Sequence, residues 1–210
     1  TEPQYPVISG DGKYQLKVWT KDEAGNICED TWQEEFKVDT TAPELENLYL
    51  TTADVDGAVG ILAQDQNSLV YRYIYQNAVN IQISFNCDIS GQSKIEYQFT
   101  SSFAYDNAKW NEYNAKTGLT VNPNKKFILA VHATDQAGNQ TIVYSDGIIV
   151  DNEAPVGEGL APEITITPDS PNANGYHNGD VGVAIFVQDP PYEDAAYNAN
   201  GIYSGLSSVL

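Results

Sequence analysis

The sequence predicts an all-β chain made of tandem β-sandwich repeats, and three observations lead to this prediction. Apolar and polar residues alternate in short runs, as at 79–85, which is typical of half-buried strands. Clusters of Gly, Pro, Asn and Asp separate these runs, and no segment has helical periodicity. Three sequence blocks also occur twice along the 210 residues at nearly the same spacing.

The repeated blocks are a strand, a turn and a linker. They occupy 14–18, 22–26 and 38–43, and again 127–131, 135–139 and 150–155. Asn26 and Asn139 are 113 residues apart, and Pro43 and Pro155 are 112 residues apart. Three blocks recurring in one order at one spacing indicate an internal repeat.

The first segment, 1–40, is expected to hold the C-terminal strands of a truncated repeat. Tyr14, Leu16 and Val18 alternate with polar residues, 22–26 forms a turn, and a returning strand ends at Val38. An isolated hairpin is marginally stable in water, so these strands need partners. The linker 39–43 follows, and Pro43 makes it short and stiff.

The second segment, 41–153, is expected to be a complete sandwich domain. Its 53–68 stretch reads as a loop or an irregular edge, and 101–115 reads as a loop with one short strand. About seven short strands in about a hundred residues are typical of a sandwich. They are expected near 45–50, 70–75, 79–87, 95–99, 119–121, 127–131 and 141–150.

The third segment, 154–210, is expected to hold the N-terminal strands of another truncated repeat. The alternation at 181–187 repeats that at 79–85 with an offset of 102, and 204–209 echoes 90–95 with an offset of 114. The difference predicts a loop insertion at about 189–201. The truncated ends are expected to dock on the central unit or to swap strands between neighbouring molecules.

Composition restricts the partners. The chain has 10 Lys+Arg against 29 Asp+Glu, a net charge of −19, which disfavours nucleic acid and anionic membranes. No apolar run approaches the ~20 residues of a membrane span. The chain begins at Thr1 and lacks Met, so we interpret it as an internal fragment of a longer protein. Cys28 and Cys87 have no metal-type spacing and are expected to be buried or half-buried.

The repeated blocks resemble a known family. Tyr-x-Leu-x-Val, Asp-x-Ala-Gly-Asn and Val-Asp-Thr-Thr-Ala-Pro, in this order, resemble the last two strands and the linker of bacterial immunoglobulin-like (Ig-like) repeats. The resemblance implies a seven-stranded sandwich found in tandem in large surface and adhesin proteins, either cell-surface or secreted. The strand at 127–133 lacks a cysteine opposite Cys87, so the inter-sheet disulfide of antibody domains is not expected.

Catalysis is not expected. The only histidines are His132 and His177, and neither lies in a nucleophile-elbow or zinc-binding motif. His132 aligns with Trp19 in the repeat, which favours a position on a sheet edge or a strand face over a role as a general base. We therefore predict that the segment is no enzyme and requires no cofactor.

Calcium binding at the junctions between units is a more specific hypothesis than catalysis. Calcium takes six to eight oxygen ligands. In a sandwich the preceding linker enters beside two loops, so the oxygens of Asp39, Asp88, Asp135 and Asn139 are candidate ligands at the first junction. Asp151 and Asp189 are the corresponding pair at the second junction. The alternative is that these residues only shape turns and fix the linker by hydrogen bonds.

Aromatic residues raise a second hypothesis, carbohydrate binding. The two candidate stacking surfaces are Tyr71, Tyr73 and Tyr75, and Phe103, Tyr105, Trp110 and Tyr113. The alternative is that these side chains pack in the interior, with Trp110 a natural core residue.

The preferred interpretation is a non-catalytic spacer in a bacterial extracellular surface protein, serving adhesion or display. Its partners would be adjacent Ig-like repeats of the parent chain. The alternative is an adhesive module that binds a glycan or a host protein through 101–115 or 189–201, alone or attached to a secreted enzyme.

Overall fold

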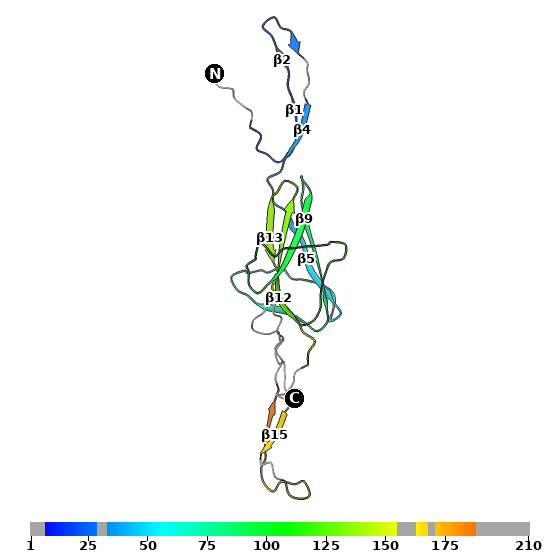
Figure 1. Ribbon diagram of the computed structural model, residues 1–210, viewed down its shortest axis with the longest axis vertical. Coiled ribbons are helices and arrows are strands. Elements are labelled where there is room, and N and C mark those ends of the chain that lie inside the picture. The colour runs from blue at the N-terminus through cyan, green and yellow to red at the C-terminus, as the bar shows by residue number, and fades with distance from the viewer. Residues whose placement is uncertain (1–6, 29–32, 155–162, 168–170, 188–210) are drawn as a thin grey trace.

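The described part of the chain is entirely β-structure. The computed structural model describes residues 7–28, 33–154, 163–167 and 171–187, and these contain sixteen strands and no helix. It follows that the described part holds no helix able to cross a membrane. The all-β prediction is therefore confirmed for this part. Figure 1 shows one hairpin beyond each end of a central pair of sheets.

The first central sheet has four strands in the order β11-β8-β5-β6. They are β5 (Glu44–Thr52), β6 (Val55–Gly60), β8 (Val79–Asn86) and β11 (Leu119–Val121). In β8 the alternation of apolar and polar residues matches alternating burial along the strand. The predicted strand at 79–87 is thus observed.

The second central sheet follows the order β10-β9-β12-β14-β7, and β13 also pairs with β12. All pairs are antiparallel except β14 with β7, which are parallel. The strands are β7 (Tyr71–Tyr75), β9 (Gln92–Thr100), β10 (Asn111–Glu112), β12 (Lys125–Asp135), β13 (Gln140–Tyr144) and β14 (Gly147–Val150).

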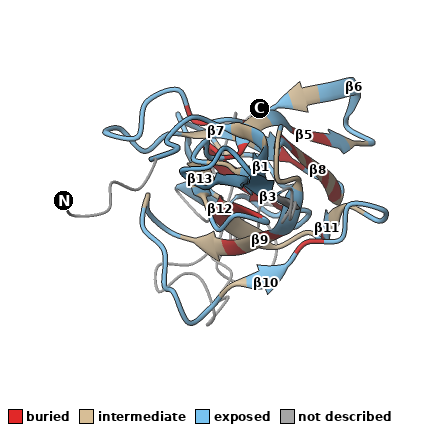
Figure 2. Cartoon of the chain, turned by 90° about the horizontal axis from the view of Figure 1, so that it is seen from above, coloured by how far each residue is buried: buried red, intermediate tan, exposed pale blue. Residues whose placement is uncertain are grey.

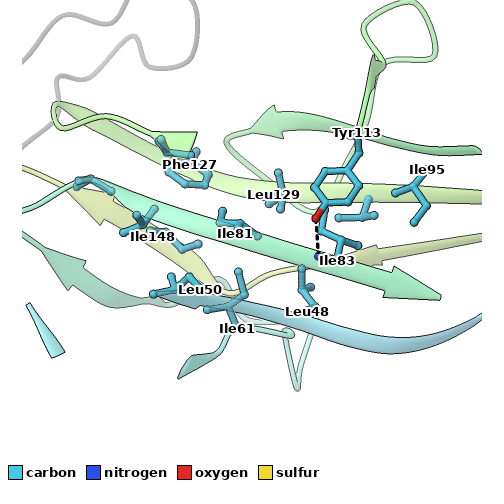
Figure 3. Close-up of a cluster of buried hydrophobic side chains, with 14 of the residues drawn as sticks. Leu48, Leu50, Ile61, Ile81, Ile83, Ile95, Tyr113, Phe127, Leu129 and Ile148 are labelled. Carbon is cyan, nitrogen blue, oxygen red and sulfur yellow. Dashed lines mark hydrogen bonds between the residues drawn. The ribbon is translucent and has the colours of Figure 1, made fainter. Parts of the chain in front are cut away.

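The two sheets share one apolar core, which is consistent with a β-sandwich. Leu50 and Ile81 from the first sheet lie in one buried cluster with Phe127, Leu129 and Ile148 from the second (Figure 3). Figure 2 shows buried residues on the central strands β5, β8, β9 and β12, whereas the edge strands β6 and β10 are exposed. Burial of each such aliphatic side chain stabilises the fold by roughly 1.5–3 kcal/mol.

Tyr113 completes this core from the long connection after β9. Its side chain is buried, and its hydroxyl oxygen accepts the backbone N–H of Ile83 at 3.0 Å (Figure 3). The pairing of β11 with β8 ends at Ile81, so the tyrosine satisfies a donor beyond the end of the ladder. Trp110, expected in the core, instead packs against a smaller cluster around Ile128 and Tyr144 on the outer face of the second sheet.

The central part has more strands than the seven expected. The stretch at 53–68, expected as a loop or irregular edge, contains the edge strand β6, which pairs with β5 through an irregular register and has Gly57 at a φ of 86° within it. The expected closing strand at 141–150 is divided at Ser145. There the Leu129 N–H donates to the Ser145 hydroxyl at 2.9 Å, and β14 continues beside the start of β12.

The hairpin on the N-terminal side has the register of the closing strands of the sandwich. In β1 (Gly12–Lys17) and β4 (Gln33–Val38), Tyr14 lies opposite Phe36. In β12 and β14, Phe127 lies opposite Ile148, which is the same pairing at the repeat spacing. The extension β2 (Thr20–Lys21) with β3 (Ile27–Cys28) likewise matches the pairing of β12 with β13.

The hairpin on the C-terminal side has the register of the opening strands. It consists of β15 (Glu163–Thr167) and β16 (Gly182–Phe186), in which Ile166 lies opposite Val183. Leu50 lies opposite Ile81 in the equivalent pair, β5 and β8. The predicted insertion at 189–201 and the strand start at 204–209 lie outside the described residues.

Candidate functional site

The candidate site is the first junction, which we define as the linker 39–43 with the turns 88–91 and 135–139 and with Asp11. The turn at 135–139 is closed by its own side chains. Asp135 Oδ1 accepts the N–H groups of Gly138 at 2.7 Å and Asn139 at 2.9 Å, and Asp135 Oδ2 accepts Asn139 Nδ2–H at 2.9 Å. Gly138 has a φ of 96°, a conformation that glycine adopts at little cost.

The same turn recurs in both hairpins. Asp22 Oδ1 accepts the Asn26 N–H and Asp22 Oδ2 accepts Asn26 Nδ2–H, both at 2.7 Å. In the C-terminal hairpin Asn172 Oδ1 accepts the Tyr176 N–H at 3.0 Å. These Asp and Asn residues therefore shape turns, as the alternative interpretation proposed.

The central sandwich holds the linker by side-chain hydrogen bonds. Asp39 Oδ2 accepts the Ser90 N–H at 2.9 Å, and Asn139 Nδ2–H donates to the Asp39 carbonyl at 3.0 Å. The Thr141 hydroxyl donates to the Pro43 carbonyl at 2.6 Å. The linker is thus attached to both turns that the sequence placed beside it, and to the start of β13.

The N-terminal hairpin holds the same linker from the other side. Asp11 Oδ1 accepts the Thr40 N–H at 2.8 Å and the Thr40 hydroxyl at 2.7 Å, and Asp11 Oδ2 accepts the Thr41 hydroxyl. These bonds, led by that of Thr41, hold the pKa of Asp11 below its ordinary value. The sequence analysis missed Asp11, although the repeat spacing aligns it with Asn124 beside the second linker.

The second junction has a related contact. Asn124, with a φ of 69°, accepts the Asn152 N–H through its side chain at a long 3.5 Å, and the Asp151 N–H donates to the Tyr75 carbonyl at 2.9 Å. Asp151 is buried. Its expected partner in calcium binding, Asp189, lies outside the described residues.

The acidic residues of the first junction create a negative environment around Cys87. Burial raises the pKa of the Cys87 thiol, and Asp135, Asp39 and Asp88 raise it further. A thiol kept protonated in this way is a poor nucleophile. Both cysteines are free; Cys87 is half-buried as expected, whereas Cys28 is exposed, because its hairpin has no facing sheet among the described residues.

Hydrogen bonds also determine the charge of Asp135. Burial raises the pKa of its carboxyl group, but the bonds from the Asn139 side chain, the Asn139 N–H and the Gly138 N–H outweigh this effect, so the net pKa lies below the ordinary value. Asp135 is therefore ionised at neutral pH while only 2% exposed.

The four proposed calcium ligands lie around this junction without forming a ligand cage. The carboxylates of Asp39 and Asp135 accept N–H donors at both oxygens, and Asp88 Oδ1 accepts Asn86 Nδ2–H. Asn139 directs its amide N–H groups, not its oxygen, at Asp39 and Asp135. Across the ranges that the structure describes, no three His, Cys, Asp or Glu residues are grouped closely enough to hold a metal ion. Calcium binding stays a prediction.

Thermal unfolding with calcium and with chelator tests this prediction. Because N–H donors already occupy the carboxylates of Asp39 and Asp135, we expect the same melting midpoint under both conditions. A midpoint that rises with calcium and returns with chelator would instead show that the cation replaces these donors. Asp135→Asn is the matched variant, since it should abolish any such rise.

The aromatic candidates are mostly packed. Tyr75 and Tyr113 are buried in the main core, and the Tyr73 hydroxyl donates to the Gly60 carbonyl at 2.7 Å. Phe103 packs edge-on to Tyr144, with ring centroids 5.7 Å apart. Tyr105 is 44% exposed and lies beside a surface hollow of about 260 Å³ lined by Gln98, Thr100, Ser102, Asp106 and Lys109.

His132 lies on the outer face of the second sheet, as the alignment with Trp19 suggested. Its ring centroid is 5.2 Å from that of Trp110, and its Nδ1 is 3.4 Å from Glu96 Oε2. Its side chain is 12% exposed. Within the described part of the chain, both ring nitrogens of His132 are buried without a hydrogen-bond partner.

Comparison with known proteins gives no family assignment. No family model matches the chain, and no curated protein has a significantly similar sequence.

Proposed function

We propose that this chain is a non-catalytic spacer segment of a bacterial extracellular surface protein built of tandem Ig-like repeats. In this proposal 41–153 is a complete repeat, and 1–40 and 154–210 are parts of its neighbours. The segment acts mechanically, by setting the distance and angle between repeats in a protein used for adhesion or display.

The observation that carries the proposal is the linker bonded on both sides. Asp11 of the hairpin and Asn139 of the sandwich both hydrogen bond to the stretch from Asp39 to Thr41. Pro43 adds a fixed φ and removes a backbone donor. A joint restrained from both neighbours keeps a nearly constant angle, which a spacer requires and a flexible linker cannot provide.

Strand order supports the Ig-like part of the proposal. If β5, β8 and β11 are taken as strands A, B and E, the order β11-β8-β5 is the E-B-A order of one Ig-type sheet. If β9, β12 and β14 are taken as strands C, F and G, the order β9-β12-β14 is the C-F-G order of the other sheet. The edge strand β7 runs parallel to the closing strand β14. The net charge of −19 supports an extended rod, because like-charged repeats repel one another.

Distance measurement between spin labels tests the rigid joint. One label is placed on Cys28 and the other on a cysteine introduced by Glu112→Cys, in a Cys87→Ser background. We expect a narrow distance distribution that becomes broad with Asn139→Ala, because the linker loses its bond to the sandwich.

Asn26→Ala is the matched control. It removes the same turn hydrogen bonds within the hairpin, where the Asn26 amide bonds to Asp22, and leaves the linker bond in place. The distribution should therefore stay narrow. A distribution that is already broad before substitution would refute the rigid joint.

A binding module is the second candidate, and the exposed Tyr105 beside its hollow favours it. A tyrosine face flanked by Asp106 and the exposed Lys109 offers stacking and hydrogen bonds to a sugar ring. The spacer remains the preferred function because Tyr113, Phe103 and Trp110 of the same group contribute to packing.

A further inference from the structure

The last strand of the central sandwich, β14, is where tension along the chain would leave the sandwich. The chain enters and leaves the central sheets at opposite ends (Figure 1), so tension pulls on the start of β5 and on the end of β14. The strand β5 has eight register pairs with β8, whereas β14 has three with β12. The exit strand β14 is therefore the end of the sandwich that most needs a second neighbour.

The strand β7 is this second neighbour. It adds four parallel pairs to β14. At the exit end of the contact, the Asp151 N–H donates to the Tyr75 carbonyl at 2.9 Å. At the other end, Arg72 Nε forms an ion pair of 2.9 Å with the buried Asp146, directly before β14. These bonds run from strand to strand, so a load along β14 strains them together and not one at a time.

A strand that holds β14 resists a load only if it is itself fixed to the rest of the sandwich. Asp54, in the turn between β5 and β6, fixes the end of β7. Its Oδ2 accepts the N–H groups of Gln76 at 2.7 Å and Asn77 at 2.8 Å, and its Oδ1 accepts the Asn77 side-chain amide. The Tyr73 hydroxyl donates to the Gly60 carbonyl at 2.7 Å. The strand β7 thus bonds to the exit strand and also to the sheet that contains the entry strand β5.

The charge of Asp54 strengthens this attachment. The bond from the Asn77 N–H, against the opposing effect of burial, holds the pKa of the Asp54 carboxyl below its ordinary value, so the group is ionised at neutral pH. Hydrogen bonds to an ionised carboxylate are about twice as strong as those between neutral groups. The Asp54 side chain is also exposed, so its removal should leave the core packing in place.

We propose that β7 is a mechanical clamp on the exit strand and that Asp54 anchors this clamp. Under tension β14 slides out only after β7 releases it or is dragged along with it, and Asp54 prevents the dragging. The inference rests on the proposed spacer function, because a chain that carries no tension does not use such a clamp. Unfolding under load is governed by the unfolding barrier, so the role of Asp54 should be visible in a lifetime under load.

Force-clamp spectroscopy of the 210-residue chain tests the clamp. The handles are attached at Glu44→Cys and Glu153→Cys in a Cys28→Ser, Cys87→Ser background. The load then enters after the linker 39–43, so the bonds of that linker are not strained. We expect Asp54→Ala to shorten the lifetime of the sandwich at constant load about tenfold or more, because the bonds to a charged acceptor are lost.

Asp65→Ala is the matched control. Asp65 Oδ1 accepts the backbone N–H of Asn67 at 2.8 Å and its side-chain amide at 3.0 Å, so the variant also loses bonds to one carboxylate and one negative charge. These bonds stay within a single loop and connect no two strands. The lifetime under load should equal that of the unmodified sandwich. Equal shortening by Asp54→Ala and Asp65→Ala would overturn the proposal.

The pulling direction separates a clamp from a general loss of stability. Handles at Glu44→Cys and Ser93→Cys, at the start of β9, pull the two sheets apart at the first junction and do not load β14 along its axis. In this direction Asp54→Ala should leave the lifetime unchanged. Shortening by the same factor in both directions would overturn the proposal, because Asp54 would then support the sandwich as a whole.

Asn77→Ala provides a milder variant in case Asp54→Ala does not fold. It removes the side-chain bond to Asp54 and keeps the carboxylate and both backbone donors, so its lifetime along the chain should lie between those of the unmodified sandwich and Asp54→Ala. An unchanged lifetime for Asn77→Ala and Asp54→Ala alike would refute the anchor. The spin-label measurement on the linker does not involve β7, so the rigid joint and the clamp can fail separately.

Discussion

Leu129→Ala should destabilise the central sandwich by about 2–5 kcal/mol. Leu129 is fully buried in the middle of β12, where it lies between the two sheets with Ile81 and Ile148 (Figure 3). Truncation removes three carbon atoms from this core and leaves a cavity that the surrounding strands fill only partly. For a domain of about a hundred residues the melting midpoint should fall by about 10 °C or more.

Leu16→Ala is the control that the repeat provides. Leu16 is the same residue type at the equivalent position, 113 residues earlier, yet it is 37% exposed in a hairpin that has no facing sheet in the described structure. We expect no change in the midpoint of the sandwich when it is truncated. Near-ultraviolet circular dichroism with urea unfolding measures both variants. If both variants lost the same amount of stability, the hairpin and the sandwich would unfold as one cooperative unit.

Local patterns predicted much of the sandwich. The alternation at 79–85 corresponds to β8, and that at 127–131 lies within β12. These strands could be predicted because the two-residue period of a strand is visible in neighbouring residues of the sequence. The turn at 135–139 was also evident, since Asp, Gly and Asn at that spacing satisfy their own backbone.

Pairings over long sequence distances were not predictable in the same way. The edge strand β6 is held by backbone bonds to β5, so its side chains carry no apolar alternation. Arg72 pairs with the buried Asp146 at 2.9 Å across 74 residues, and no local pattern links the two. The sequence also could not predict which aromatic side chain enters the main core. Trp110 and Tyr113 lie three residues apart in one irregular connection, and only Tyr113 is part of that core.

The candidate junction was predicted in position but not in chemistry. Strand order brought the linker, 88–91 and 135–139 to one end, and the structure places them there. What the carboxylates bind depends on the directions of N–H groups, which residue types alone do not reveal. Asp11 could have been found from the repeat spacing, by asking which residue of the first copy aligns with Asn124.

Gly147→Ala should cost the sandwich about 1–3 kcal/mol, towards the upper end of that range. A Cβ atom at this position would lie 2.6 Å from Cδ1 and 2.9 Å from the backbone Cα of Tyr71. The ring could rotate away, but the Cα belongs to the parallel strand β7 and cannot move without disturbing its ladder. The measurement is the urea midpoint, and Gly60→Ala is the control, since a Cβ there meets no atom within 4 Å.

The physical consequence of Gly147→Ala should extend beyond its immediate contact. Among the described strands, β7 joins the second sheet only through β14, and its last residue, Tyr75, accepts the Asp151 N–H at 2.9 Å. Displacing β7 would therefore loosen the exit towards the second linker as well as the edge of the sheet. Hydrogen exchange should accelerate at both the Gly147 and the Asp151 amides in the variant. Acceleration at Gly147 alone would show that the second linker is held independently of β7.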